Sequence, residues 1–223
     1  MSTNIHLSAI IEDNVSIGEA TSIWDNVHIR YGTIIGEECI IGEKSYIAYD
    51  VRIGHRVKIN GFVSICTGVT IEDGVMIAAG TIFTNDRFPR ATTSDLKKLR
   101  PSEPDESTLP TLIRNGATIG AGCVIGCGLT VGQFAMIGMG SVVTRTIPDF
   151  CLALGNPARV CGVVCRCGQL LLRHDPLEKP AVSDVQCPAC SLGYALTNGQ
   201  ITEHALNAKI LHDTSSRNAA THA

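Results

Sequence analysis

Isoleucine recurs at every sixth position from Ile5 to Ile77, and Phe83 takes the next place in the series. Four residues after most of these positions comes a small or β-branched residue, such as Thr21 or Cys39. A period of six matches neither a helix, with 3.6 residues per turn, nor a strand that alternates every two residues. It is typical of a chain wound into a prism, in which each hexad supplies one short strand and one corner. We therefore expect the isoleucines to stack inside along one edge, with the small residues filling the space near the corners.

The hexad pattern is interrupted once and then resumes in the same register from Ile113 to Val143. The intervening stretch, 84–112, is polar and contains four prolines, so it predicts one long loop that leaves the prism. Long loops inside compact domains are uncommon and are usually functional. A surface ornament without a function is the alternative.

Composition excludes several classes of function. The net charge of −3 leaves no basic footprint for nucleic acid. No run of eighteen apolar residues is present, and residues 1–10 lack the layout of a signal peptide, so we expect no membrane segment and a cytoplasmic protein. Two of the ten cysteines, Cys39 and Cys123, fall in inward hexad positions, where they would act as small hydrophobic residues. Reduced thiols in the cytoplasm are favoured over a disulfide scaffold.

The chain divides into three predicted segments. Residues 1–160 form the all-β hexad prism with its loop. Residues 161–204 are rich in cysteine and have lost the six-residue period. Residues 205–223 are rich in Ala, Asn, Ser and Thr, and we expect this tail to be poorly ordered.

The cysteine-rich segment has the spacing of a metal site. Cys187 and Cys190 form a C-x2-C knuckle, which lets two thiolates reach one tetrahedral zinc. The upstream pair, Cys165 and Cys167, is one residue shorter than the usual knuckle. We predict a structural zinc ion held by these four cysteines, with Cys161 as the alternative to one of the first pair.

A zinc-ribbon-like fold is expected around this metal. Residues 194–202 predict a hairpin closed by an Asn-Gly turn. A unit of about 40 residues seldom holds together without a metal or a cross-link. The alternative is a ribbon that packs on the prism without metal. Four thiolates leave no open coordination position, so catalysis by this zinc is not expected.

Three stretches carry a resemblance to a known family: FTNDRFPR at 83–90, RNGATIGAGCVIGCGLTVG at 114–132, and TRTIPDFCLALGNPARV at 144–160. Together with the hexads they are similar to the left-handed β-helix acyltransferases of the hexapeptide-repeat superfamily. The closer likeness is to the branch that N-acetylates amino groups of nucleotide-linked sugars, and it covers about residues 5–162. The resemblance implies left-handed winding and a homotrimer. It also implies that acetyl-CoA lies between adjacent prisms, with active sites at the subunit boundaries.

The catalytic candidates are Asn85, Asp86 and His28. Acyl transfer to a hydroxyl usually needs a positioned histidine base, and the loop contains none, whereas an amine needs only an acceptor that orients it. Asn85 matches the asparagine that lies by the amino group in the family, the alternative being a cap on the turn. Asp86 could anchor the sugar or cap the loop. His28 ends an I-W-x-x-V-H stretch similar to one in the family, the alternative being a surface or trimer-contact residue.

Acetyl-CoA requires groups that bind phosphate and a surface for the pantetheine arm. Arg145 and Arg159 are candidate phosphate partners, and Arg159 lies in the closing GNPAR motif. Outward glycines would permit close approach of the pantetheine, although turn chemistry at the corners would explain them equally. These glycines are Gly120, Gly122, Gly126, Gly138 and Gly140.

The function predicted on these grounds is N-acetylation of a nucleotide-linked aminodeoxy sugar by acetyl-CoA. An O-acetyltransferase, or another acyltransferase with a small-molecule acceptor, remains an alternative. A zinc carbonic anhydrase of similar shape would need three histidines, and His28 and His55 are the only two between Leu7 and Arg173. The non-enzymatic alternative is a trimeric scaffold whose ribbon recruits a partner.

Overall fold

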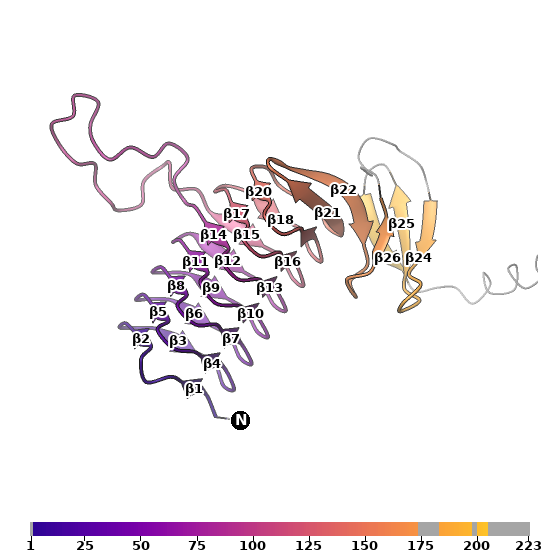
Figure 1. The fold of residues 1–223 in the computed structure, drawn as a ribbon, viewed down its shortest axis with the longest axis horizontal. Helices are drawn as coiled ribbons and strands as arrows, with labels where there is room; N and C mark the ends of the chain where they lie inside the picture. Colours follow the sequence, from indigo (N-terminus) through magenta and orange to yellow (C-terminus); the bar gives the residue numbers. More distant parts are fainter. Residues whose placement is uncertain (1, 174–182, 198–199, 205–223) are drawn as a thin grey trace, which may run out of the picture.

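The computed structural model describes residues 2–173, 183–197 and 200–204, and every regular element in these ranges is a β-strand. Short strands follow one another around a common axis and stack into a prism (Figure 1). Strands of successive turns pair in parallel, with partners 18 residues apart, such as Asn4 and Ser22. Three hexads therefore make one turn, and the chain forms the expected left-handed parallel β-helix.

Three sheets make the flat sides of the prism, and we call them faces A, B and C. Face A contains β1 (Asn4–Ile5), β4 (Ser22–Ile23), β7 (Ile40–Ile41), β10 (Lys58–Ile59), β13 (Met76–Ile77), β16 (Thr118–Ile119) and β19 (Met136–Ile137). Face B contains β2 (Ile10–Ile11), β5 (His28–Ile29), β8 (Tyr46–Ile47), β11 (Ser64–Ile65), β14 (Ile82–Phe83), β17 (Val124–Ile125) and β20 (Val142–Val143). Face C contains β3 (Ser16–Ile17), β6 (Ile34–Ile35), β9 (Arg52–Ile53), β12 (Val69–Ile71), β15 (Thr111–Ile113) and β18 (Thr130–Val131).

The hexad isoleucines fill the interior, as predicted, but they are not confined to one edge. Successive isoleucines such as Ile41, Ile47 and Ile53 belong to faces A, B and C in turn, and each is at most 3% exposed. They therefore form three interior columns, because a six-residue step is one third of a turn. At the N-terminal end the interior is less covered, and Ile5 is 43% exposed.

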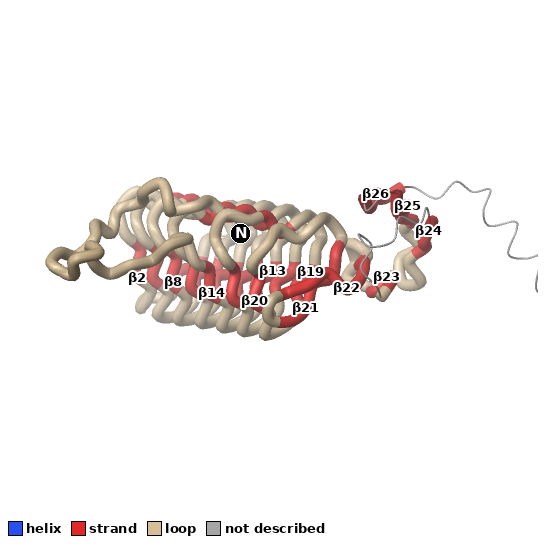
Figure 2. Tube along the Cα trace, turned by 90° about the horizontal axis from the view of Figure 1, so that it is seen from above, coloured by secondary structure: helices blue, strands red, loops and turns tan. Residues whose placement is uncertain are grey.

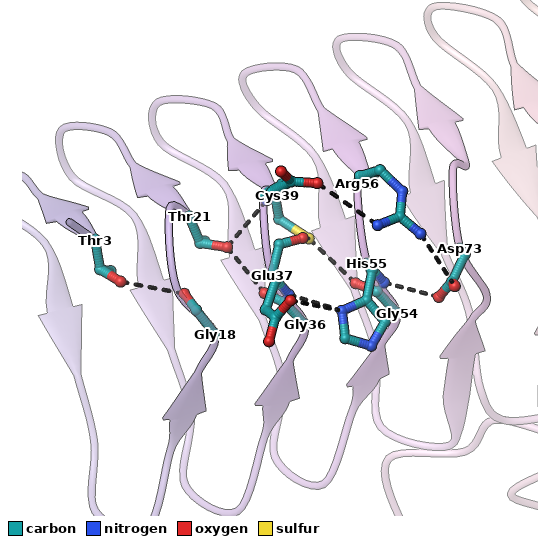
Figure 3. Close-up of polar contacts among 11 residues, drawn as sticks. Thr3, Gly18, Thr21, Gly36, Glu37, Cys39, Gly54, His55, Arg56 and Asp73 are labelled. Atoms are coloured by element: carbon teal, nitrogen blue, oxygen red, sulfur yellow. Dashed lines mark hydrogen bonds and ion pairs between the residues drawn. The ribbon is translucent and has the colours of Figure 1, made fainter. Parts of the chain in front are cut away.

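Polar residues in the small hexad positions are satisfied by the backbone of the next turn. Thr21 Oγ1 donates to the carbonyl of Gly36 at 2.8 Å and accepts from the amide of Cys39 at 3.0 Å. The Cys39 thiol donates in turn to the carbonyl of Gly54 at 3.1 Å, which continues the ladder seen in Figure 3. Burial raises the pKa of this thiol, and it behaves as the interior residue that the pattern predicted.

The long loop interrupts the prism without changing its register. Ladder partners lie 18 residues apart in the turns on either side of the loop but 42 apart across it, as for Met76 and Thr118, so the loop adds 24 residues to one turn. It leaves after β14 and projects away from the stacked turns (Figure 1). Phe83 and Ile113, on either side of it, are fully buried. The interior continues past the insertion as though it were absent.

After β20, the chain returns to extend face A and then forms a separate sheet. Face A continues with β21 (Cys151–Gly155), β22 (Ala158–Val164) and β23 (Leu170–Leu172), the last two pairing in antiparallel fashion. The predicted division at residue 160 falls within β22.

Sheet D follows, with β24 (Ser183–Gln186), β25 (Gly193–Thr197) and β26 (Gln200–His204). The last two strands form the expected hairpin, whereas its Asn-Gly turn and the tail at 205–223 lie outside the described residues. Figure 2 shows sheet D beyond the last turns of the prism, at the end opposite β2. In the described part of the chain there is no helix with the length and apolar character to cross a membrane.

Candidate functional site

The loop begins and ends in a short antiparallel neck beside face B. The backbone carbonyl of Asn85 accepts from the amide of Leu109 at 3.0 Å, and Asp86 forms a bridge with Thr108. The amide of Arg87 donates to the carbonyl of Ser107 at 3.1 Å. These contacts hold the FTNDRFPR stretch at a defined place from Asn85 onward, two residues beyond the buried end of β14.

The two polar candidates in the neck differ in how their side chains are used. Asp86 Oδ1 accepts from the amide of Phe88 at 2.8 Å, which is the local turn contact expected of a loop cap. Asn85 is half-buried, and its side chain makes no hydrogen bond with any described residue. The side chain of Asn85 is therefore not a turn cap. Its amide and carbonyl remain available to a ligand.

The outward surface next to this neck is apolar. Ile82, Val124 and Val142 occupy the outward positions of β14, β17 and β20, and Ile82 is 46% exposed. Exposed outward hydrophobic residues also occur on the other faces, such as Ile34 on face C and Ile40 on face A, so this row is notable for its place beside the neck. This apolar row could have been predicted from the sequence, because each of the three residues directly precedes an inward hexad residue.

Four of the predicted cofactor glycines, Gly120, Gly122, Gly138 and Gly140, lie along the corner between faces A and B, at the edge of the same apolar surface. Gly126 follows β17 at the corner between faces B and C. Gly122 and Gly140 have φ values of 67° and 69°, and an added Cβ at either would meet nothing within 4 Å. Their outer side is therefore open. At Gly120 an added Cβ would lie 2.5 Å from the amide nitrogen of Met139, so this glycine is required by the stacking of turns.

The remaining two glycines in this set are also closely packed. An added Cβ at Gly138 would lie 2.0 Å from a methyl of Leu154, and at Gly126 it would lie 3.0 Å from the Val143 carbonyl. Close packing at the corners therefore explains why position 120 is glycine, and it partly explains the glycines at positions 126 and 138. Gly122 and Gly140 are left as the better candidates for contact with the pantetheine arm.

The two predicted phosphate-binding arginines are separated. Arg145 follows β20 at the corner between faces B and C, which is the corner from which the loop leaves two rungs earlier. Rungs are about 4.8 Å apart, so about 10 Å separates these levels along the axis. Arg159 lies in β22 opposite Leu154, and both arginines are exposed. Arg145 thus belongs to the same end of face B as Asn85, whereas Arg159 lies on the extension of face A.

His28 lies on face B but at its other end. The ladder runs from His28 through Tyr46 and Ser64 to Ile82, three rungs that span about 14 Å. Within one chain, the structure therefore does not bring His28 and Asn85 together.

His28 is held by a charged network in the first turns. Its Nε2 lies 2.8 Å from Glu12 Oε1, and Glu12 also forms an ion pair with Arg30 at 2.6 Å. The ion pair with Arg30, together with His28 and the amide of Tyr31, holds the pKa of Glu12 at about 2. The His28 ring packs edge-on against Tyr46 at a centroid distance of 5.6 Å. Glu12 is a partner that sequence reasoning missed, because it is visible only once the 18-residue turn is known.

The other prism histidine is part of a corner ladder. His55 Nδ1 accepts from the amide of Glu37 at 3.1 Å, and the His55 amide donates to Asp73 Oδ1 at 2.8 Å (Figure 3). These bonds join three successive turns between faces C and A. These structural hydrogen bonds explain the presence of His55 without a catalytic role.

A hollow in the outer part of the loop adds two arginines that the sequence did not single out. Its volume is about 590 Å3, and Arg90 and Arg100 contribute to its lining. Arg100 is paired with Asp105 at 3.0 Å. Arg90 donates to the Pro89 carbonyl and has no carboxylate partner among the described residues. Its guanidinium is therefore available for an anionic group.

The four predicted zinc ligands converge. The Sγ atoms of Cys165, Cys167, Cys187 and Cys190 all lie within 4.8 Å of one another. Cys161 lies upstream in β22 and is not one of this group.

Comparison with known proteins follows the same division of the chain. The family model described as bacterial transferase hexapeptide (six repeats) matches residues 8–48. The model described as hexapeptide repeat of succinyl-transferase matches residues 50–85 and 110–145. Together they account for just over half of the chain and leave out the loop. The protein belongs to the hexapeptide-repeat family of transferases.

Curated relatives match over single stretches. The chain is 56% identical over 62 residues to the dTDP-3-amino-3,6-dideoxy-alpha-D-galactopyranose 3-N-acetyltransferase of Aneurinibacillus thermoaerophilus. That stretch is 28% of this chain and 32% of the relative. The chain is also 43% identical over 53 residues to the galactoside O-acetyltransferase of Escherichia coli, and this second match covers 24% of this chain and 26% of the relative. The chain thus matches about a third or less of the length of these relatives.

A solved structure supports the fold over a longer range. A variant of AntD, an N-acyltransferase from Bacillus cereus in complex with dTDP and Coenzyme A, aligns with a TM-score of 0.50 and 20% identity. The alignment covers 74% of this chain and 85% of that protein. At this identity, the likeness establishes the shared architecture.

Proposed function

We propose that the protein is an acetyl-CoA-dependent N-acetyltransferase that acts on the amino group of a nucleotide-linked aminodeoxy sugar. The observation that carries the proposal is the half-buried Asn85 side chain, which has no hydrogen-bond partner among the described residues. It lies at the loop neck, next to an apolar surface edged by open glycines. The 56% identity to a dTDP-aminosugar N-acetyltransferase over 62 residues supports the same activity.

The proposed reaction needs orientation more than a strong base. The Asn85 carbonyl accepts one N–H of the unprotonated amine and directs the nitrogen lone pair at the thioester carbonyl. The C–N bond forms, the C–S bond breaks, and the departing CoA thiolate takes the proton that the amine loses. The products are the N-acetyl sugar and free CoA thiol. Gly122 and Gly140 would face the pantetheine arm, and Arg145 would meet a phosphate group.

The acceptor sugar carries its own phosphates. We assign these to the hollow in the outer loop, where Arg90 has no carboxylate partner among the described residues. Arg90→Gln should therefore raise KM for the nucleotide-linked sugar while leaving kcat nearly unchanged, because the group acts in binding. Arg87→Gln is the matched control on the same loop. Equal kcat and KM in Arg90→Gln and the parent protein would remove Arg90 from the acceptor site.

We propose further that the active unit is a homotrimer with its sites at the subunit boundaries. Face B is flat, and its exposed apolar row would be covered by a neighbouring prism or by the cofactor. A boundary site also accounts for the distance between His28 and Asn85 within one chain, since residues from two subunits would contribute.

The test is release of free thiol from acetyl-CoA with a panel of nucleotide-linked 3-amino and 4-amino sugars. Matched hydroxyl sugars serve as controls, and binding of CoA is measured separately by calorimetry. Turnover on an amine and none on its hydroxyl partner is the expected result. No turnover on any amine, with CoA binding intact, would overturn the N-acetylation proposal. Absence of CoA binding would support the scaffold alternative.

O-acetylation is the second candidate, and one observation favours it. His28 is hydrogen-bonded to a carboxylate, which is the arrangement that fixes a general base for a hydroxyl acceptor. If a hydroxyl sugar proves to be the substrate, His28→Gln should abolish turnover. If an amine is the substrate, the same variant should retain most of it.

A further inference from the structure

The four-cysteine cluster lies outside the proposed transferase site, and its sulfur atoms have the spacing of a metal site. A tetrahedral zinc ion with Zn–S bonds of about 2.3 Å places its sulfur atoms about 3.8 Å apart. Cys165 and Cys190 are 3.4 Å apart at Sγ, and Cys167 and Cys187 are 3.6 Å apart. All four sulfur atoms lie within 4.8 Å of one another. This fourfold convergence is what one metal ion requires. Two separate disulfides would need only pairwise contacts.

The cluster joins two parts of the chain that are distant in sequence. Cys165 and Cys167 follow β22, which extends face A, whereas Cys187 and Cys190 lie between β24 and β25 of sheet D. Cys165 and Cys187 are buried, and Cys167 and Cys190 are exposed. A metal at this place would therefore cross-link the end of the prism to sheet D.

The cysteine ligands have supporting contacts of the kind that orient metal ligands. The Tyr194 hydroxyl lies 3.1 Å from Cys165 Sγ and accepts from the amide of Arg166 at 3.0 Å. With the amide as its donor, the hydroxyl is free to donate to the sulfur. The amide of Cys167 also lies 3.5 Å from Cys165 Sγ. Hydrogen bonds to a ligating thiolate hold its position and stabilise its charge.

Tyr194 connects the cluster to the interior of the prism. It is fully buried and contacts Phe150 at a centroid distance of 5.4 Å, and Phe150 stacks on Phe134 at 5.6 Å. Arg166 lies over the Phe134 ring at 5.1 Å and forms an ion pair with Glu203 of β26 at 3.1 Å. Sheet D thus closes the C-terminal end of the core, where hexad stacking stops.

We propose that Cys165, Cys167, Cys187 and Cys190 bind one structural Zn²⁺, and that this metal fastens sheet D as a lid on the C-terminal end of the prism. Four thiolates fill the coordination sphere, so the metal takes no part in acyl transfer. Sheet D consists of three short strands, and a unit of this size usually needs a metal or a cross-link in addition to its buried apolar surface. The proposal is independent of the acetyltransferase proposal.

Metal content of the full-length protein is the first test. We expect about one zinc per chain by elemental analysis of protein purified without added metal. Cobalt exchanged into the site should show the d–d bands of tetrahedral coordination together with thiolate charge-transfer bands. These measurements use the unmodified chain, so they do not depend on the folding of a variant. A folded protein without zinc, or with two disulfides among these cysteines by mass spectrometry, would overturn the proposal.

Variants identify the ligands and the role of the metal. The Cys187→Ser, Cys190→Ser double variant should lose the zinc, whereas Cys161→Ser should keep it. A strong chelator should lower Tm of the parent protein and increase its binding of a hydrophobic dye, because the aromatic end of the core becomes exposed. The chelator should have no effect on the double variant. Retention of zinc by the double variant, or an unchanged Tm after the parent has lost its zinc, would contradict the lid role.

Discussion

At the scale of single residues, Asn85 differs from its neighbours in the loop neck. Asp86 is occupied by the amide of Phe88, and the Asn85 backbone is occupied by Leu109. The Asn85 side chain, by contrast, makes no hydrogen bond with a described residue. The half-buried amide is reachable by solvent, so a bound ligand could take up its donor and acceptor groups.

Replacement of Asn85 should therefore affect chemistry and not folding. Asn85→Ala should lower kcat about 100-fold, because the amine loses its orienting acceptor. Its Tm should change little, since no hydrogen bond to a described residue is removed. Steady-state kinetics and thermal unfolding check both outcomes. Asn4→Ala, an exposed asparagine on face A, is the matched control. Parent-like turnover in Asn85→Ala would exclude Asn85 from the site.

Glu12 should make stability depend on acid pH. Its folded-state pKa of about 2 lies below the ordinary value of 4.5, so its ionised form contributes stability above pH 4.5. That contribution is lost as the pH falls from 4.5 towards 2. The Tm difference between the parent and Glu12→Gln should therefore be largest near neutral pH and vanish towards pH 2. Glu19→Gln, at an exposed corner, is the matched control. A pH-independent difference would contradict the role of the network.

At the scale of elements, the corners between faces A and B combine two requirements. The stacking of turns needs glycine at Gly120, where an added Cβ would meet the backbone of the next turn. The surface beyond Gly122 and Gly140 is open. The left-handed backbone at such corners does not itself demand glycine, since Ala20 adopts a φ of 58° at another corner. An open glycine where alanine would be tolerated is consistent with contact to a ligand.

Alanine substitutions should separate these requirements. Gly120→Ala should destabilise the protein by about 3 kcal/mol, because the backbone of the next turn must move. Gly140→Ala should cost about 1 kcal/mol for its left-handed backbone and should raise KM for acetyl-CoA by crowding the pantetheine. Denaturant unfolding and kinetics measure the two effects. Equal losses of stability would contradict the steric account, and an unchanged KM would remove Gly140 from the cofactor surface.

At the scale of the whole molecule, the six-residue period was enough to predict the prism, which residues are buried in it and the register across the loop, but not the three interior columns of isoleucine. Each turn packs only on the turns before and after it, so one repeat is enough to predict which residues pack together. The pairing of His28 with Glu12 could not be predicted without the number of residues per turn, and neither could the distance between His28 and Asn85. The contacts of Tyr194 with Cys165 and Phe150 could not be predicted, because the cysteine-rich segment has no period to relate distant residues.

The assembly should be a trimer. Sedimentation velocity at micromolar protein should give one species with three times the mass of the chain, because active sites at boundaries require neighbouring prisms. Asn85→Ala should sediment identically, which separates loss of chemistry from loss of assembly. A stable monomer that retains full turnover would contradict the boundary site.

One matched pair of substrates distinguishes N-acetylation from O-acetylation. A nucleotide-linked sugar with an amine at one carbon is compared with the same sugar carrying a hydroxyl there, each with acetyl-CoA, and the products are identified by mass spectrometry. We expect a product heavier by one acetyl group from the amine, with an equal amount of free CoA, and no acetylated product from the hydroxyl sugar. Acetylation of the hydroxyl sugar alone would contradict N-acetylation and would place His28, in place of Asn85, at the centre of the mechanism.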